Sequence, residues 1–401
     1  MALDVAALRE GFPSLKSGIA HFDGPGGTQT PAVVGEAVAA TLTGPLSNRG
    51  RSVLSERNAD DAVAAFRSAF ADLLGVPAAG VVHGRSATAL AYDFSRHLAK
   101  NWGPGDEIVV TRLDHDSNVR PWIQAAERAG ATVRWLELNP ATADLDLSAI
   151  DEVIGERTRL VAVTGASNLL GTRPDVAAIA TRAHEVGALA YVDGVHRTAH
   201  DLVDISALGA DFYTCSPYKF FGPHCGVLAA SPDLLETITP DKLMPSTNVV
   251  PERFEFGTLP YELLAGATAA VDFLAGLGEG ATRRARLAAA HHEISDHEMS
   301  LRRRVEQAVA GWGDAAMLHS VAADRTPTLF MTFPGRRSAE VSAFLSERDI
   351  QVPAGTFYAY ETFAALGISH DDAGLRVGVA AYTDDADVDR LLTGIDDFLS
   401  P

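Results

Sequence analysis

The feature that most constrains the fold is an alternation of short apolar runs with helical patterns between residues 107 and 192. The apolar runs predict strands at residues 107–111, 132–136, 160–164 and 189–192. Between them, apolar residues at helical spacing predict helices near residues 118–129, 147–154 and 176–184. Strands that alternate with helices are typical of a parallel, doubly wound sheet. The sequence therefore predicts an α/β fold with a mainly parallel sheet.

Further elements are predicted on both sides of this region. Helices are expected at residues 31–42 and around residues 63–75, and Val81-Val82 starts a short buried strand. A charged helix at 280–310 precedes strands at 329–333, 351–352 and 375–379 and helices at 339–348 and 386–398. We expect an N-terminal arm at 1–22 that packs on the small domain, a large domain at 23–278 and a smaller α+β domain at 279–401.

Unusual polar residues fall where the predicted strands end. Ligands of open α/β sheets bind beyond the carboxyl ends of the strands. The residues at these ends are Asp114-His115, Ser167-Asn168, Asp193 with His196, and Ser216 with Lys219. Taken singly, the two histidines are typical of structural histidines, but the coincidence of four strand ends predicts one site at this edge.

Lys219 is the only formally charged residue after Asp211 in the stretch DFYTCSPYKFFGPHCG. Apolar strands precede and follow it, so desolvation is expected to lower the pKa of its ammonium group. Such a lysine is a nucleophilic amine that can form a Schiff base with a carbonyl cofactor. The alternative is a lysine whose stem packs beside a turn while its ammonium reaches water.

Asp193 ends the apolar strand ALAYVD, where an uncompensated carboxylate would be costly. It should therefore meet a cation, and a protonated pyridine nitrogen is one candidate. A buried ion pair with Arg197 and a helix N-cap are the alternatives.

Two segments are candidates for close contact with a ligand. The helix expected near Ser86 has free N–H groups in its first turn and a hydroxyl at Thr88, which together could hold a phosphate. Ordinary N-capping explains Ser86 equally well. The glycines of FDGPGGTQT allow close backbone approach, but their order is not a dinucleotide fingerprint, and a plain turn is an equal alternative.

The composition excludes several classes of function. A net charge of −19 opposes binding to nucleic acids or an anionic membrane surface. The two cysteines, Cys215 and Cys225, form no metal-ligand pattern, so we expect no zinc or other metal and no disulfide framework. The charged N-terminus and the absence of apolar runs of membrane length favour a cytoplasmic protein.

With these residues placed, the chain resembles the class V aminotransferases of the fold-type I pyridoxal-phosphate enzymes. It is most similar to the cysteine desulfurase-like branch, which also includes isopenicillin N epimerase. The resemblance covers nearly the whole chain, and its motifs occur in the family's order: LDHDSNVRPW, ASNLLGT, YVDGVH, DFYTCSPYKFFGP, RFEFGT and LRVG.

The resemblance implies a role for each matching residue around pyridoxal 5'-phosphate. Catalysis would rest on Lys219, which holds the aldehyde and moves the α-proton, on His115, which stacks on the ring, and on Asp193, which pairs with the pyridine N–H. The ring-oxygen side would meet Asn168 and His196, where the family more often has glutamine. The phosphate would be held by Ser86, Ala87, Thr88, Ser216 and, from the partner subunit of a homodimer, Thr258. Arg376 would clamp the substrate carboxylate, with Asn48 and Tyr358 on substrate-binding loops.

Two departures from the desulfurase pattern bear on the reaction. Tyr218, a cofactor contact, precedes the lysine where desulfurases usually have histidine. Tyr358 in IQVPAGTFYAYE stands where desulfurases carry the loop cysteine that takes up sulfur. The cysteines of this chain flank the lysine instead and are expected to pack in or beside the sheet.

These features favour a pyridoxal-phosphate enzyme that acts on an amino acid through a Cα carbanion, with a C–S lyase type β-elimination preferred over persulfide transfer. Aminotransfer and epimerisation use the same residues and are the alternatives. A member that binds the cofactor without turnover is a further alternative, which Lys219, Asp193 and Arg376 together oppose. A nicotinamide dehydrogenase is excluded because no GxGxxG follows the first strand.

Overall fold

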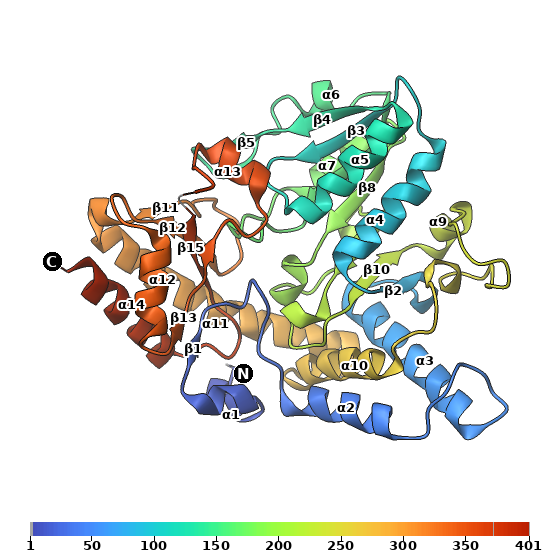
Figure 1. The fold of residues 1–401 in the computed structure, drawn as a ribbon, viewed down its shortest axis with the longest axis horizontal. Coiled ribbons are helices and arrows are strands. Elements are labelled where there is room, and N and C mark those ends of the chain that lie inside the picture. The colour runs from blue at the N-terminus through green and yellow to red at the C-terminus, as the bar shows by residue number, and fades with distance from the viewer. Residues whose placement is uncertain (1–2, 372, 401) are drawn as a thin grey trace.

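The computed structural model describes residues 3–371 and 373–400. Residues 1, 2, 372 and 401, which belong to the expected arm and small domain, lie outside the described residues. Figure 1 shows a large part built around one twisted sheet and a smaller part that carries the C-terminus. Within the described residues, no helix has the length and apolar character needed to cross a membrane.

The large sheet has seven strands in the order β2-β10-β9-β8-β7-β3-β4. The bounds are β2 (Val81–Gly84), β10 (Gly226–Ala230), β9 (Phe212–Cys215), β8 (Leu189–Asp193), β7 (Thr158–Thr164), β3 (Glu107–Thr111) and β4 (Thr132–Leu136). Strand β10 runs antiparallel to both of its neighbours, and the other paired strands are parallel. The predicted α/β fold with a mainly parallel sheet is confirmed.

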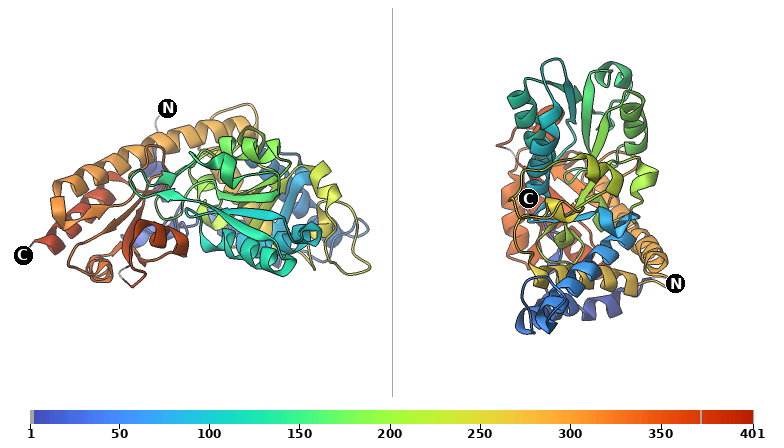
Figure 2. Two further views of the ribbon diagram at one scale, coloured as in Figure 1. Left: turned by 90° about the horizontal axis from the view of Figure 1, so that it is seen from above. Right: turned by 90° about the vertical axis from the view of Figure 1, so that its right-hand side faces the viewer.

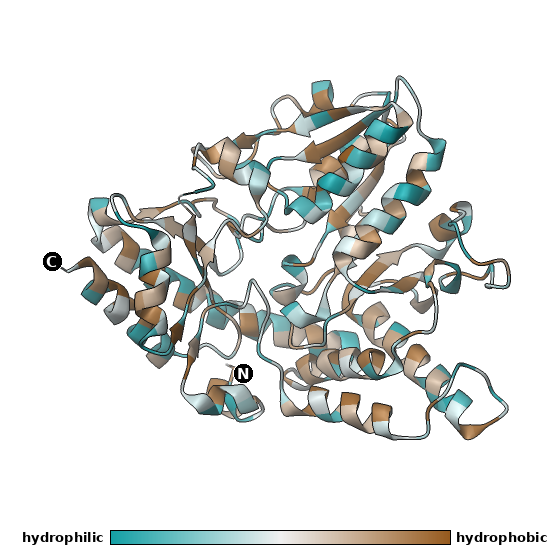
Figure 3. Cartoon of the chain, viewed as in Figure 1, coloured by the Kyte–Doolittle hydropathy of each residue, from teal (hydrophilic) through white to brown (hydrophobic). Residues whose placement is uncertain are grey.

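Helices cover both faces of this sheet, which explains its continuous apolar strands. One face packs against α4 (Ala87–Leu98) and α5 (Arg120–Ala129), whose Phe94 and Trp122 lie in one core cluster. The other face packs against α3 (Leu54–Leu74), α7 (Val176–Glu185) and α10 (Tyr261–Gly276). Successive strand residues alternate between the two clusters, as Ile108 and Val109 do. The hydropathy colouring of Figure 3 shows these strands as predominantly apolar.

The smaller part contains a four-stranded sheet in the order β11-β12-β15-β14. Its bounds are β11 (Met317–Leu318), β12 (Thr328–Thr332), β15 (Gly374–Gly378) and β14 (Ala354–Gly355), with helices α12 (Ser338–Ser346), α13 (Tyr360–Leu366) and α14 (Asp385–Leu399). Near the N-terminus, β1 (Ala20–His21) pairs in parallel with β13 (Ile350–Gln351), so the N-terminal segment contacts this part.

A single helix of 29 residues, α11 (Arg283–Gly311), joins the two parts. Figure 2 shows this helix, drawn in gold to orange, running along one side of the molecule from the large part to the smaller part. The loop before β12 also reaches across, because Thr172 and Arg325 form an isolated bridge and Thr326 donates its N–H to Gly171 O at 2.9 Å. These connections hold the large and the smaller part together.

The remaining elements are short or peripheral. They are α1 (Val5–Glu10), α2 (Ala32–Thr43), α6 (Ile150–Val153), α8 (Ile205–Leu208), α9 (Pro232–Thr237), β5 (Leu138–Asn139) and β6 (Asp144–Leu145).

Candidate active site

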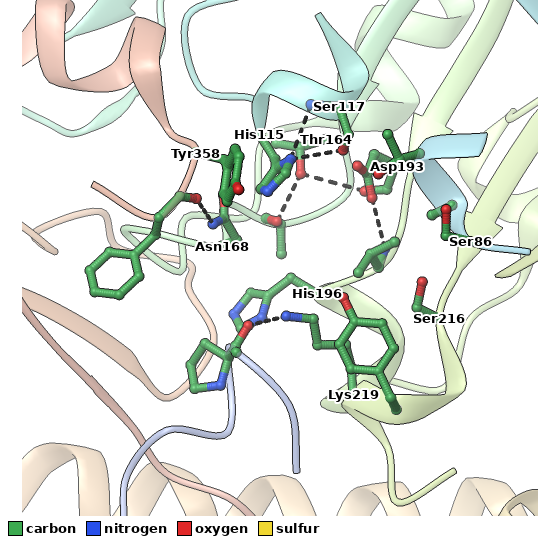
Figure 4. A pocket seen from close by; sticks show the side chains of 18 of the residues that line it. Ser86, His115, Ser117, Thr164, Asn168, Asp193, His196, Ser216, Lys219 and Tyr358 are labelled. Carbon is green, nitrogen blue, oxygen red and sulfur yellow. Dashed lines mark hydrogen bonds between the residues drawn. The ribbon is translucent and has the colours of Figure 1, made fainter. Parts of the chain in front are cut away.

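A cavity of about 330 Å³ lies where the carboxyl ends of the central strands meet the smaller part of the structure. Most of the predicted site residues line it: Ser86, Ala87, Thr88, His115, Asn168, Asp193, His196, Ser216, Tyr218, Lys219, Tyr358 and Arg376. Figure 4 shows how several of these side chains converge from different elements. The topology therefore brings together residues that are up to 290 positions apart, from Ser86 to Arg376 (376 − 86 = 290).

Lys219 lies in a single 3-10 turn (Pro217–Lys219) directly after β9, and its side chain is buried. Its Nζ donates a hydrogen bond to the carbonyl oxygen of Pro25. Burial, and secondarily the charge of Arg376, lower the pKa of Lys219 to about 7, against the opposing effect of Asp193. The amine is therefore substantially unprotonated near neutral pH, in agreement with the expectation that desolvation would make it nucleophilic.

Asp193 is the last residue of β8 and is also buried. Its Oδ1 accepts a hydrogen bond from Val195 N at 2.9 Å, and burial raises the pKa of the carboxyl to about 6 although Lys219 opposes the shift. The alternative ion pair with Arg197 is wrong, because the Nε of Arg197 lies 3.4 Å from Oδ2 of Asp201 instead. The carboxylate faces the cavity with only a local backbone contact.

His115 begins the 3-10 turn that precedes α5. Its Nδ1 accepts the backbone N–H of Ser117 at 3.0 Å, so the proton of the neutral ring is on Nε2. Burial, together with the charges of Lys219 and Arg376, lowers the pKa of His115 to about 4. The ring stacks against Tyr358 with centroids 5.3 Å apart and planes at 29°.

The first turn of α4 forms one wall of the cavity. Ser86 is its N-cap, and its hydroxyl accepts the N–H of Ala89 at 3.0 Å, so the capping interpretation of Ser86 is confirmed. The N–H groups at Ala87 and Thr88 have no intrahelical acceptor because they belong to the first turn. Gly226, at the start of β10, lies directly against this turn, and a Cβ at residue 226 would be 2.6 Å from Ala87 N. The cradle is suited to an anion.

His196 is held by two hydroxyl groups, from the start of β12 and the loop before it. Its Nε2 lies 2.9 Å from Oγ1 of Thr326 and 3.0 Å from Oγ1 of Thr328. Burial lowers the pKa of His196 well below its ordinary value, so the ring is neutral. Its Nδ1 is buried and has no hydrogen-bond partner among the described residues.

Arg376 projects from β15 and is 4% exposed. Its Nη1 donates to the carbonyl oxygen of Asn168 at 2.9 Å, and its guanidinium carbon lies 3.8 Å from the ring centroid of Phe357. Burial lowers the pKa of Arg376 to about 9, with Asp23 opposing the shift. The side chain of Asn168 donates from Nδ2 to Phe357 O at 2.9 Å, a contact that the sequence did not predict.

Several predicted residues lie away from the cavity. Asn48 and Thr258 are exposed. The contact of Thr258 with the phosphate of a partner subunit and the place of Asn48 on a substrate-binding loop stay predictions. Asp114 and Ser167 are buried behind the cavity and bind their own loops: Asp114 accepts from Asn118 Nδ2 at 2.7 Å, and Ser167 Oγ accepts from Leu170 N at 3.2 Å. Both cysteines are free and buried, as the sequence predicted.

Some lining residues were missed by sequence reasoning, namely Pro25, Gly26, Ser117, Thr164, Ala166, Val195 and Phe357. The glycine-rich stretch FDGPGG was a usable signal for the first two, because close approach was one of its two interpretations. Phe357 lies in the loop 356–360, which was expected to take part in substrate recognition, so the sequence indicated this loop but not the residue.

The chain matches a family model described as aminotransferase class-V over residues 20–391. It is 32% identical over 416 residues to the uncharacterized protein MT3887 of Mycobacterium tuberculosis, covering 98% of this chain and 99% of that protein. It is 31% identical over 412 residues to a probable cysteine desulfurase of Pseudomonas aeruginosa, covering 97% and 96%. The crystal structure of the Escherichia coli cysteine desulfurase CsdA, at 27% identity, superposes with a TM-score of 0.87 over 99% of this chain and 98% of that one.

Proposed function

Because the chain belongs to the aminotransferase class-V family, we propose that it is a pyridoxal-phosphate-dependent C–S lyase. Its substrate would be an amino acid with sulfur on the β-carbon. The observation that carries this proposal is that a buried amine, Lys219, and a buried carboxylate, Asp193, line one cavity, whose described lining residues include no cysteine. Tyr358 occupies the loop position of the desulfurase cysteine.

The residues present fit pyridoxal phosphate. Asp193 is a buried carboxylate that forms no ion pair within the described residues. In the cofactor-free protein, a carboxylate that is to bind a protonated ring nitrogen must be unpaired in this way. The α4 cradle, with Thr88 and Ser216 beside it, suits the phosphate, and the unpartnered Nδ1 of His196 suits the ring oxygen. When bound, the cofactor supplies an aldehyde for the lysine and a ring that accepts the electron pair left on Cα.

The chain's own residues would then divide the work of the elimination. Arg376 binds the α-carboxylate of the substrate and orients Cα toward Lys219. Nζ of Lys219 takes the proton from Cα, and Asp193 keeps a proton on the ring nitrogen. The bond between Cβ and sulfur breaks, and sulfur leaves as a thiol or sulfide. The remaining 2-aminoacrylate reacts with water to give pyruvate and ammonia, so atoms and electrons balance.

A homodimer with sites at the subunit interface is part of the proposal. Support comes from exposed apolar side chains close in sequence to the exposed Thr258, including Met244, Val249 and Phe256. Such side chains are typical of surfaces that another protein covers. A cytoplasmic location stays a prediction from the composition.

The test is to incubate the purified holoenzyme with L-cysteine, L-cystine and L-cystathionine, with L-alanine as the control without a leaving group. Pyruvate, ammonia and the released sulfur compound are quantified, and the cofactor spectrum is followed. Stoichiometric pyruvate with sulfide from L-cysteine, a thiol from L-cystathionine or a persulfide from L-cystine supports the lyase. A D-amino acid product, or amino-group transfer to an added keto acid, would replace it with epimerisation or aminotransfer, and a coloured protein without any turnover would replace it with a binding role.

A further inference from the structure

Two adjacent non-glycine residues, Phe357 and Tyr358, both adopt left-handed backbone conformations, with φ of 54° and 57°. This region is uncommon for residues other than glycine, and it persists where surrounding contacts determine the backbone. The two residues form a turn between β14 and α13, at the mouth of the cavity. We call residues 357 and 358 the aromatic turn.

The aromatic turn is held from the large domain at both of its carbonyl groups. Asn168 Nδ2 donates to Phe357 O at 2.9 Å, and Asp116 N donates to Tyr358 O at 2.8 Å. Just beyond the turn, Glu361 in α13 forms ion pairs with Arg112 and Arg120 of the large domain. The aromatic turn belongs to the smaller part of the structure, and these contacts anchor it on the large part.

The two rings of the turn contact two different site residues. Tyr358 stacks on His115, whereas the ring of Phe357 lies over the guanidinium of Arg376 at 3.8 Å. Arg376 in turn donates to Asn168 O at 2.9 Å. Asn168, Phe357 and Arg376 thus form a closed circuit of three contacts.

This circuit determines which part of the guanidinium is free. An aromatic face attracts a cation and holds the plane of a stacked guanidinium. Arg376 forms no ion pair with any described carboxylate, and its buried Nε lacks a hydrogen-bond partner. Phe357 therefore covers one face of the guanidinium, and Nη1 already donates to Asn168. The edge of the guanidinium that carries Nε is left to bind a planar anion such as a carboxylate.

We propose that Phe357 is the positioning residue for Arg376 and that it sets the preference of this enzyme for substrates with an α-carboxylate. The inference rests on the proposed function, in which Arg376 binds that carboxylate. Phe357 itself touches no reacting atom in this scheme. It acts by fixing the plane in which Arg376 presents its donors, and Asn168 holds Phe357 in place.

The probes are L-alanine and ethylamine, which differ only by the carboxylate. Both are primary amines that can displace Lys219 from the cofactor, so apparent dissociation constants are read from the cofactor absorbance of the holoenzyme. The ratio of the two constants measures carboxylate preference. If neither probe changes the absorbance of the parent protein, the proposed function itself fails, which is a different result from a ratio that does not respond to substitution at Phe357.

Phe357→Leu should reduce this ratio about fivefold to tenfold, because one cation–π contact in a desolvated site is lost. Phe357→Tyr keeps the aromatic face and should keep the ratio. Phe344→Leu is the matched control, because it removes an equivalent ring from the guanidinium of Arg348, 3.5 Å from the ring centroid, and neither residue lines the cavity. Phe357→Met replaces the leucine variant if that variant does not fold, as judged by circular dichroism.

Two results would overturn the proposal. The first is an unchanged ratio in a folded Phe357→Leu or Phe357→Met protein. The second is an equal loss of affinity for L-alanine and ethylamine, since that is what a general disturbance of the turn would cause.

Discussion

A Cβ atom at Gly226 would lie 2.3 Å from the carbonyl carbon of Ser86, closer than any tolerated contact. Strand β10 therefore lies against the first turn of α4 only because residue 226 is glycine. We predict that Gly226→Ala displaces this turn and weakens binding of the cofactor phosphate roughly tenfold or more, the effect of losing one charge-assisted hydrogen bond. Equilibrium titration with pyridoxal phosphate measures the change.

Gly103→Ala is the matched control for this prediction, because a Cβ there meets nothing within 4 Å. Unchanged cofactor affinity in a folded Gly226→Ala protein would show that the phosphate binds elsewhere.

Lys219 should be the lysine that binds the cofactor covalently. The purified protein is expected to be yellow, and Lys219→Ala should lose the visible absorption while keeping its circular dichroism spectrum. Borohydride reduction followed by peptide mapping should label Lys219. The control variant Lys100→Ala should behave as the parent, because Lys100 pairs with Asp241 and does not line the cavity. Labelling at another lysine contradicts the assignment.

The pH dependence of cofactor capture should reflect the burial of Lys219. Its pKa is lowered from 10.5 to about 7, so the fraction of unprotonated amine rises through pH 7. The rate at which cofactor-free protein captures pyridoxal phosphate should therefore level off above about pH 8. A rate that continues to climb toward pH 10 would indicate an ordinary exposed lysine.

Asp193→Asn should stabilise the cofactor-free protein at pH 8 and slow the reaction. Burial raises the pKa of this carboxyl from 3.8 to about 6, so the folded state binds more protons between these values. The protonated Asp193 carboxyl therefore stabilises the folded state fully below pH 3.8, and this stabilisation is lost as the pH rises through 6. At pH 8 the free energy of unfolding is lower by about 2 to 3 kcal/mol as a result. Asparagine removes that cost, and turnover should fall roughly a hundredfold.

Chemical denaturation at pH 8 and pH 4 measures the stability difference, with Asp314→Asn at an exposed position as the control. Near-normal turnover in Asp193→Asn would rule out its role at the ring nitrogen, whatever the stability result.

The Cys215→Ala, Cys225→Ala double variant should retain most of its sulfur release. Burial raises the pKa of Cys225 to about 12 and that of Cys215 well above its ordinary value, so neither is a thiolate near neutral pH. Neither residue lines the cavity. Loss of release in this variant, together with a protein-bound persulfide found by mass spectrometry in the parent, would restore the desulfurase mechanism.

The sequence by itself determined the α/β class and the edge of the sheet at which the site lies. Apolar runs at regular spacing leave few ways to bury their side chains, and the carboxyl ends of parallel strands meet at one edge. It also predicted a desolvated Lys219, because apolar strands precede and follow it, although distant residues such as Pro25 and Arg376 also surround its amine. The motif resemblance added the remaining large-domain residues, and all of these except Thr258 and Asn48 line the cavity.

Only the tertiary structure decided the contacts between the large and the smaller part. Asn168 and Phe357 are 189 positions apart, and nothing in either segment indicates that an amide would meet that carbonyl group. The same holds for the hydroxyls of Thr326 and Thr328 on His196, and for the contact of Lys219 with Pro25. Such contacts depend on how the two parts of the chain pack together, and local periodicity carries no information about that packing.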